Sequence, residues 1–403
     1  MKVRLVLPGL VAVLVSALLG SSSAFAGESA FFPFNIASES TYRLDVAGGS
    51  MSVRVEAEFQ STGPDLDSVA LWAMPGATGL AVMEGDTVLE TTAEVGSTEA
   101  GELSLITAKL PKPLKGKNRT ELTMTYSVPS QKNDYVNLEP GLAEALFVSQ
   151  GAGSFVFIEM PIGGDNYVEP GCLRTQEQPG PVKDAGFERF VCGDATAIAF
   201  STEDKSVQER CARLDDRCRQ QLFLPFSGFA QSITDDAKKG ILEADVAMAN
   251  GPVKLTLRYF SRDRAWAETE FALAQRALPL LEQTFNFPYP HERVDLRQSN
   301  FIEFGGAAGL AFPGEGQMLI AHSGDAAFDN EVTVHELAHQ WAGRNLETSW
   351  LWEGLAQWAT EKLAPTLGFT IYDRQWQAWG YTDPLATWWT SGVTNPDYWY
   401  GKA

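Results

Sequence analysis

Two histidines four positions apart, with a glutamate beside the first, are the residues whose types and spacing could do chemistry. They are His335, Glu336 and His339 in the run H-E-L-A-H, in a chain with four histidines among 403 residues. On a helix, four residues make about one turn, so both imidazoles project from one face and can bind one metal ion. Glu336 then lies beside the metal and can act as a base toward a water molecule. The pattern predicts a hydrolytic metal site; a buried helix with two chance histidines is the alternative.

The surrounding residues indicate a helix that buries one side. Apolar residues recur at the helical spacing of three and four: Val334, Leu337, Ala338 and Trp341. We expect Asp329 or Asn330 to cap the start of this helix and Gly343 to end it.

A second helix is expected from about Ser349 to just before Pro365, and it can supply a third metal ligand. Its buried stripe would contain Trp352, Leu355, Ala356, Ala359 and Leu363. Glu353 lies off this stripe in the first turn, where an ordinary solvated glutamate would look similar. The neighbouring run Trp350-Leu-Trp352 suggests burial, and a buried carboxylate needs a cation. Two histidines and one glutamate are a common ligand set for a catalytic zinc ion, so Glu353 is the expected third ligand of one zinc.

The first 26 residues are typical of a secretory signal peptide. A positively charged start precedes an apolar stretch, and the small residues Ala24 and Ala26 indicate cleavage before Gly27. An uncleaved membrane anchor is the alternative, but the apolar stretch is short for a span and contains Pro8. We therefore expect an exported protein, secreted or periplasmic, without a membrane association after cleavage.

The charge balance argues against nucleic acid and anionic lipid as partners. Formal net charge is −20, from 31 Lys and Arg against 51 Asp and Glu. The first 26 residues contain two basic residues and no acidic ones, so the remainder carries −20 − 2 = −22. Such a surface favours solubility and says nothing about oligomeric state.

The cysteines cluster in one part of the sequence: Cys172, Cys192, Cys211 and Cys218. In an exported protein, an even and clustered set predicts two disulfide bonds, with three possible connectivities. Proximity in sequence favours the pairs Cys172–Cys192 and Cys211–Cys218. A zinc cluster is the alternative, although the spacing lacks C-x-x-C pairs.

Sequence periodicity divides the chain into two parts. Apolar and polar residues alternate between about residues 42 and 129, which predicts half-buried strands. After Tyr259 the apolar spacing changes to three and four, which predicts a long helix from about Arg262 to Phe285, kinked or broken at Pro279. The expected fold class is α+β. An antiparallel β-sandwich domain (27–257) follows the signal peptide (1–26) and precedes a mainly helical domain (258–403).

A glycine-rich run, Gly305-Gly-Ala-Ala-Gly309, follows a strand expected from Val294 to Phe301. Glycines at such a place let a strand edge lie close to another backbone or a ligand. His291 and His322 have no partner at a metal-binding spacing, and we expect them to be ordinary histidines.

Together these motifs resemble the aminopeptidase N-like gluzincins, zinc metallopeptidases with a β-sandwich domain before a thermolysin-like catalytic domain. Residues 335–341 match that family's H-E-L-A-H-Q-W, residues 351–356 resemble its L-x-E-G-F-A, and residues 285–290 resemble its F-G-x-P-Y-P turn. The run that begins at Tyr400 resembles its Y-x-K-G segment, whose tyrosine supports the tetrahedral intermediate. The resemblance implies zinc, assigns its third ligand to Glu353 and gives Tyr400 a catalytic role.

The sequence departs from that family in three places. The stretch between His339 and Glu353 is shorter than in the family, as trimming of a loop between two helices would produce. The family's G-x-M-E-N strand has a glutamate that binds the free amine of the substrate, and Gly305–Gly309 contains none. The chain ends just after Tyr400, so the thermolysin-like domain is expected to be incomplete at its C-terminus.

These observations predict an enzyme, a zinc metallopeptidase of aminopeptidase type that acts on a peptide or protein. Glu336 would be the general base, and Tyr400 would donate a hydrogen bond to the oxyanion. The substrate backbone would be held by strand addition at Gly305, Gly306, Ala307 and Ala308. Two alternatives remain: an endopeptidase without recognition of the free amine, and an exported binding or scaffold protein that holds zinc without turnover.

Overall fold

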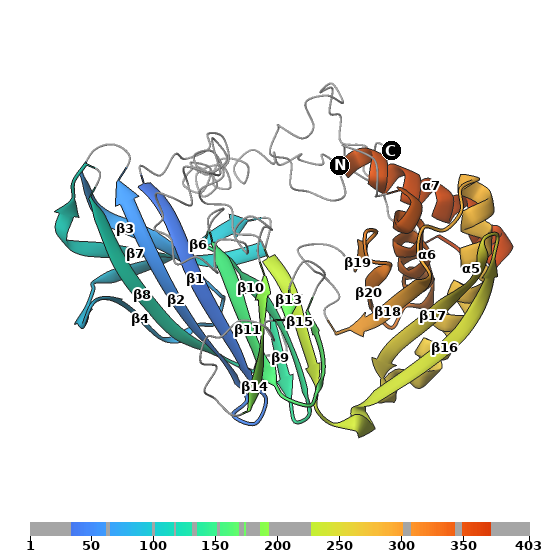
Figure 1. Cartoon of the computed structure of the whole chain (residues 1–403), viewed down its shortest axis with the longest axis horizontal. Helices are drawn as coiled ribbons and strands as arrows, with labels where there is room; N and C mark the ends of the chain where they lie inside the picture. The colour runs from blue at the N-terminus through green and yellow to red at the C-terminus, as the bar shows by residue number, and fades with distance from the viewer. Residues whose placement is uncertain are drawn as a thin grey trace, which may run out of the picture. The chain divides into compact units, whose positions relative to one another are not determined.

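A computed structural model describes most of the chain between its two ends (Figure 1). The described residues are 34–61, 65–98, 101–116, 118–130, 135–150, 154–168, 173–174, 186–192, 227–300, 308–342 and 349–371, and all belong to one compact unit. The expected signal peptide lies outside them, as do Cys172, Cys211 and Cys218. Cys192 is buried at the end of a strand. The disulfide pairing therefore remains a prediction.

The N-terminal part consists of strands in three sheets. The largest has the order β13-β14-β11-β1-β2-β8-β4-β5. Its strands are β13 (Leu173–Arg174), β14 (Phe187–Cys192), β11 (Phe155–Pro161), β1 (Phe34–Asp45), β2 (Ser50–Ser61), β8 (Arg119–Pro129), β4 (Thr78–Glu84) and β5 (Thr87–Val88). A three-stranded sheet contains β3 (Leu66–Ala73), β7 (Gly101–Leu114) and β6 (Thr91–Thr98). A four-stranded sheet contains β12 (Asp165–Val168), β15 (Ser227–Ile233), β10 (Leu142–Val148) and β9 (Val136–Glu139).

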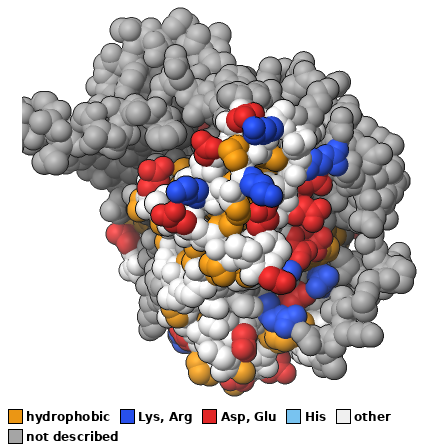
Figure 2. Space-filling view, turned by 90° about the vertical axis from the view of Figure 1, so that its left-hand side faces the viewer, with side chains coloured by type: hydrophobic (Ala, Val, Ile, Leu, Met, Phe, Trp, Pro, Cys, Tyr) orange, Lys and Arg blue, Asp and Glu red, His pale blue; other side chains and the backbone are white. Residues whose placement is uncertain are grey.

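Among the described residues, strand pairing in these sheets is antiparallel with one exception. β1 pairs with β11 in parallel, across more than a hundred residues of sequence. The period-two pattern identified the strands correctly: every second residue of β2 is buried, including Val53 and Val55, and Arg54 between them is exposed. Burial of each such side chain contributes about 1.5–3 kcal/mol. Figure 2 shows one face of the molecule, on which acidic and basic side chains are interspersed.

A five-stranded sheet follows, in the order β16-β17-β18-β20-β19. Its strands are β16 (Lys239–Met248), β17 (Gly251–Phe260), β18 (Arg293–Ser299), β20 (Gln317–Ala321) and β19 (Gly309–Phe312). Short 3-10 helices η1 (Asp236–Lys238) and η2 (Ser261–Asp263) flank the first hairpin. β18 is parallel to both neighbours, and β19 is antiparallel to β20. The boundary expected between residues 257 and 258 falls inside β17, and the position of the domain boundary stays a prediction.

In the part of the chain that the structure describes, three α-helices accompany this sheet: α5 (Arg264–Phe285), α6 (Ala326–Ala342) and α7 (Ser349–Leu367). The α+β fold class is therefore confirmed, with sheets first and a helical region after them. No helix among the described residues is long and apolar enough to cross a membrane.

The effects expected of two prolines were wrong in part. α5 runs without a break through Pro279, and α7 continues past Pro365. A proline removes one helical hydrogen bond, but buried apolar residues continue on both sides of it, as Leu367 does in α7. Gly368 ends α7 instead. It has a φ of 84°, and its N–H donates to the carbonyl of Ala364.

The cap of α6 also differs from the expectation. Asp325 accepts hydrogen bonds from the backbone N–H of Ala327 (2.9 Å) and of Phe328 (3.3 Å), so it caps the helix. Asp329, one of the two expected caps, is buried one turn further on. The sequence placed the start of α6 too far along the chain, because the apolar stripe used to find it begins one turn after the helix does.

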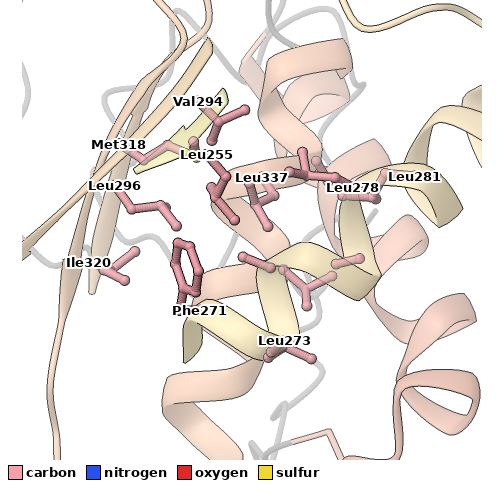
Figure 3. Close-up of a cluster of buried hydrophobic side chains, with 14 of the residues drawn as sticks. Leu255, Phe271, Leu273, Leu278, Leu281, Val294, Leu296, Met318, Ile320 and Leu337 are labelled. Atoms are coloured by element: carbon pink, nitrogen blue, oxygen red, sulfur yellow. The ribbon is translucent and has the colours of Figure 1, made fainter. Parts of the chain in front are cut away.

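One hydrophobic core joins the five-stranded sheet to the helices (Figure 3). Leu255, Val294 and Leu296 from the sheet belong to the same buried cluster as Phe271 and Leu278 of α5. α6 contributes Val334, Leu337 and Ala338, three of the four residues that the helical stripe predicted; the fourth, Trp341, is partly buried against the cluster. The packing therefore fixes the orientation of α6 about its own axis.

A buried carboxyl between α5 and α6 makes stability depend on pH. Glu270 is 1% exposed, and its Oε2 has no partner among the described residues. Burial raises the pKa of Glu270 from 4.5 to about 7; a hydrogen bond with Thr333 opposes this and the charge of Asp329 adds to it. Between pH 4.5 and 7 the folded state holds a proton that the unfolded state has lost. Stability should therefore fall by about 3 kcal/mol as pH rises through this window.

Replacing Glu270 with Gln tests this linkage. At pH 8 the variant should resist urea unfolding better than the wild type by up to about 3 kcal/mol, and near pH 4 the two should be similar. Glu268→Gln is the matched control, since Glu268 is exposed on the same helix. Equal stabilities of the Glu270→Gln variant and the wild type at pH 8 would contradict the assignment.

Candidate metal centre

Three side chains from two helices converge on one point. The Nε2 atoms of His335 and His339 lie 3.0 Å apart. Oε2 of Glu353 lies 3.1 Å from Nε2 of His335 and 3.4 Å from Nε2 of His339. Among the described residues, this is the one group of three or more His, Cys, Asp or Glu side chains able to surround a metal ion. The expected trio is thus brought together by α6 and α7.

The donor set fits zinc. Imidazole nitrogen and carboxylate oxygen are zinc ligands at about 2.0–2.2 Å, so the donors of a tetrahedral site lie about 3–3.5 Å from one another. The three distances here agree with this. Both histidines are buried, while the side chain of Glu353 is 27% exposed. The group could therefore offer three protein ligands and a side open to solvent, the arrangement of a catalytic zinc site.

The electrostatics of the trio are those of a carboxylate held between two imidazoles. Burial alone would raise the pKa of Glu353, but hydrogen bonds from His335 and His339 and their charges lower it overall. Burial lowers the pKa of His339, yet the bond to Glu353 leaves it raised. Glu353 is thus ionised at neutral pH, the form that binds a cation.

Glu336 points to the edge of the five-stranded sheet. It is buried, and burial raises its pKa although both neighbouring histidines oppose this. A Cβ added to Gly309, the first residue of β19, would lie 2.5 Å from Cγ and 2.7 Å from Oε1 of Glu336. The backbone of β19 therefore lies directly against the expected general base, and only glycine leaves room for it.

Replacing Gly309 with Ala should displace the Glu336 carboxylate. We expect kcat to fall about 10- to 100-fold, since a misplacement of about 1 Å can cost about 100-fold, while zinc content stays at the wild-type level. Gly314→Ala is the matched control, because a Cβ there meets nothing within 4 Å. The measurements are peptide hydrolysis and bound zinc. Full activity in the Gly309→Ala protein would mean that Glu336 need not occupy this position.

Further contacts hold α6 in place, and sequence reasoning did not identify them. Asp329 accepts hydrogen bonds from Ser323 and lies 2.9 Å from Nδ1 of His322, which joins the start of α6 to the end of β20. Nε2 of Gln357 on α7 donates to Glu331 on α6 at 3.2 Å. The sequence did contain a signal for these contacts, because acidic residues at 329 and 331 interrupt the apolar pattern of the helix and need polar partners.

The end of α6 is fixed by the aromatic turn after α5. Nε1 of Trp341 donates to the carbonyl oxygen of Phe287 at 2.8 Å. Its ring stacks on Phe285, with centroids 6.0 Å apart and planes at 9°. The turn at residues 285–290, which resembles a family motif, thus contacts α6, the helix that contains both histidines.

The remaining expected site residues are described only in part. Ala308 is half-buried, and its carbonyl accepts a hydrogen bond from the N–H of Ala321. Gly305, Gly306, Ala307 and Tyr400 lie outside the described residues, so their roles stay predictions. His291 contacts the carbonyl of Pro313 and His322 contacts Asp329, and neither joins the metal group.

Comparison with known sequences finds a match to a family model in the second part of the chain. Residues 269–393 match the model described as the peptidase family M1 domain. The alanine/arginine aminopeptidase of Saccharomyces cerevisiae is 27% identical over 137 residues, which make up 31% of this chain and 16% of that protein. This chain therefore spans less than a fifth of the curated relative's length.

Comparison with solved structures finds matches to the M1 zinc metallopeptidase from Deinococcus radiodurans. A mutant of it is 16% identical with a TM-score of 0.39, over 84% of this chain and 72% of that one. Another structure of this metallopeptidase is 17% identical with a TM-score of 0.37, over the same shares. A mutant bound to a Tyr-Ser-Ala substrate is 15% identical with a TM-score of 0.38.

Proposed function

We propose that the protein is a zinc-dependent peptidase of aminopeptidase type, and the match of residues 269–393 to the model of the peptidase family M1 domain supports this. The observation that supports this most directly is the convergence of His335, His339 and Glu353, with Glu336 beside them. The curated relative bears the name of an aminopeptidase. The substrate would be a peptide or protein.

His335, His339 and Glu353 would hold one zinc ion. When bound, zinc supplies a Lewis acid that lowers the pKa of water and polarises a peptide carbonyl. Glu336 takes a proton from the attacking water and transfers it to the leaving amine. Its burial keeps bulk water from competing for this proton, and the contact with Gly309 holds its carboxylate at the edge of β19. Tyr400 would stabilise the oxyanion by a hydrogen bond, a role worth about 3–4 kcal/mol.

The edge strand β19 suits an extended peptide. It is the last strand in the order of its sheet among the described residues, and it begins at Gly309 beside Glu336. A peptide that pairs with such an edge gains main-chain hydrogen bonds and passes the catalytic base. Residues 305–309 contain no glutamate to bind a free amine, so the end of the peptide that is recognised needs a direct test.

The test compares two substrates of equal sequence, one with a free amine and one with this amine blocked. Zinc-loaded protein should cleave the free peptide from its N-terminus and leave the blocked one intact, as followed by mass spectrometry of the products. Cleavage of the blocked peptide at an internal bond would identify an endopeptidase instead. Zinc-loaded protein that cleaves neither would support a binding or scaffold role.

We also propose that the protein is exported after removal of residues 1–26. The sequence around Ala24 and Ala26 supports this. Expressed in a host with a secretory pathway, the mature protein should begin at Gly27 by N-terminal sequencing. An intact N-terminus at Met1 in exported protein would overturn the proposal.

A further inference from the structure

A second contact joins α6 and α7 one helical turn away from the metal group. Nε2 of Gln357 on α7 donates to Oε1 of Glu331 on α6 at 3.2 Å. Both residues are buried, Gln357 with 7% and Glu331 with 1% of its surface exposed. Gln357 follows Glu353 by four positions, and Glu331 precedes His335 by four. Four residues make about one turn, or about 6 Å along the axis, so this contact lies on the same facing sides of the helices as the ligands.

The two contacts have the order expected of antiparallel helices. His335 contacts Glu353, which is 18 positions later in the sequence. Glu331, one turn before His335, contacts Gln357, which is 26 positions later. A step back along α6 thus corresponds to a step forward along α7. If one helix slid along the other, both contacts would break together, so the bond at Gln357 is suited to set the position of the turn that contains Glu353.

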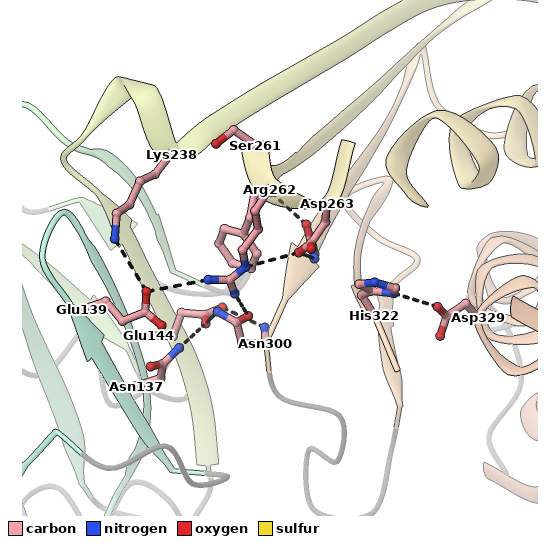
Figure 4. A network of polar contacts seen from close by, with 12 residues as sticks. Asn137, Glu139, Glu144, Lys238, Ser261, Arg262, Asp263, Asn300, His322 and Asp329 are labelled. Carbon is pink, nitrogen blue, oxygen red and sulfur yellow. Dashed lines mark hydrogen bonds and ion pairs between the residues drawn. The ribbon is translucent and has the colours of Figure 1, made fainter. Parts of the chain in front are cut away.

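α6 has its own attachments to the rest of the fold, so α7 is the helix that must be positioned against it. Asp329 in the first turn of α6 lies 2.9 Å from Nδ1 of His322, directly after β20 (Figure 4). Trp341 holds the other end of α6 to the turn after α5. α7 is attached to α5 by Arg276, whose Nη1 donates to the carbonyl of Leu367 at 3.0 Å. That bond lies at the end of α7 remote from the ligand glutamate.

The amide of Gln357 is also oriented from within its own helix. Its Nε2 donates to Oε1 of Glu361, four positions later on α7, at 3.1 Å. An amide nitrogen has two hydrogens, so it can make this bond and the bond to Glu331 together. The variant Glu361→Gln keeps a side-chain oxygen that can accept the same bond. The donor that reaches across to α6 is therefore held in place before the metal binds.

We propose that Gln357 is a positioning residue for the metal site: its bond to Glu331 holds α7 in the register that keeps Glu353 beside the two histidines. The proposal rests on the proposed zinc site. Ligand distances in metal sites vary by only about 0.2 Å, so a shift of α7 by about 1 Å would take Glu353 out of range. Gln357 is not one of the three ligand residues. Its loss should therefore weaken zinc binding without removing a ligand.

The test measures the zinc affinity of metal-free protein by competition with a chelator of known affinity. Gln357→Leu removes the donor and leaves the net charge unchanged. The Kd for zinc should rise about tenfold, as for other residues that support a metal ligand. The swap variant, Glu331→Gln with Gln357→Glu, places the donor on α6 and the acceptor on α7, again with unchanged net charge. Because the contact is restored, the swap variant should bind zinc within about threefold of the wild type.

Thr360→Val is the matched control. Oγ1 of Thr360 is buried and donates to the carbonyl of Ala356 at 2.8 Å, so this variant loses a buried hydrogen bond that lies within α7. It should lower the unfolding temperature and leave zinc affinity unchanged. The proposal is overturned by wild-type zinc affinity in folded Gln357→Leu protein, or by an equal loss of affinity in Thr360→Val or in the folded swap variant. If Gln357→Leu does not fold, Glu331→Leu breaks the same contact from α6 and decides by the same measurement.

The two proposals fail in different ways. Zinc binding by wild-type protein without peptide hydrolysis, together with weaker zinc binding after Gln357→Leu, would refute the peptidase and support the positioning role. Zinc-dependent hydrolysis by the wild type, together with unchanged zinc affinity after Gln357→Leu, would support the peptidase and overturn the positioning role. Wild-type protein that binds no zinc would overturn both.

Discussion

Replacement of Glu336 with Gln is expected to lower peptide hydrolysis by about 10³-fold and leave zinc bound. Glutamine has nearly the same shape as glutamate but cannot accept the proton of the attacking water, and general-base catalysis contributes about 10²–10⁴-fold. The carboxylate does not belong to the group of three ligand atoms, so the metal should remain. The measurements are kcat for a free-amine peptide and zinc per protein by elemental analysis.

The control for this variant is Glu361→Gln on α7, which removes an exposed carboxylate in the same part of the molecule. It should keep wild-type kcat and wild-type zinc. If Glu336→Gln hydrolyses peptide at the wild-type rate, another group is the base and the assigned mechanism is wrong.

Replacement of Glu353 with Gln is expected to have the second largest effect, on the metal itself. The carboxylate lies within 3.1–3.4 Å of both histidine Nε2 atoms, and its charge offsets part of the charge of a divalent ion. Loss of a residue that only supports a ligand costs about 10–100-fold in metal affinity, so loss of a direct ligand should cost at least about 100-fold. Competition with a chelator of known affinity measures this, and hydrolysis should return only at high zinc concentration.

Two measurements show whether Glu353 binds the metal directly or only lies close to it. Glu361→Gln, on the same helix, should bind zinc as the wild type does. A Glu353→Gln protein with wild-type zinc affinity would show that the third ligand lies elsewhere, and His335 and His339 would then need another partner.

Much of the metal site could be predicted because it depends on local spacing. His335, Glu336 and His339 lie on one helix, where positions along the sequence fix positions in space. Glu353 lies on the next helix, so spacing alone could not identify it. Its assignment came from the usual ligand set of catalytic zinc and from the resemblance to the gluzincin motif. The period-two pattern likewise identified β2 and β8, whose buried residues alternate with half-buried or exposed ones.

What escaped prediction depends on contacts between distant parts of the chain. The close approach of Gly309 to Glu336 and the bond from Gln357 to Glu331 join residues on separate elements. No periodicity reports such contacts. The parallel pairing of β1 with β11 is of the same kind. Local signals were also misread where packing overrides them, as at Pro365, where buried Leu367 keeps α7 helical.

The most direct test of the catalytic zinc site is a zinc titration of metal-free protein, with hydrolysis of a free-amine peptide as the readout. We expect no turnover without metal, and a rate that rises linearly until one zinc per chain is bound and then stays constant. His339→Ala protein, which lacks one of the three converging ligands, should stay inactive at the same zinc concentrations. Full turnover by metal-free protein, or a hydrolysis rate that does not change when zinc is added, would contradict the claim that His335, His339 and Glu353 form a catalytic zinc site.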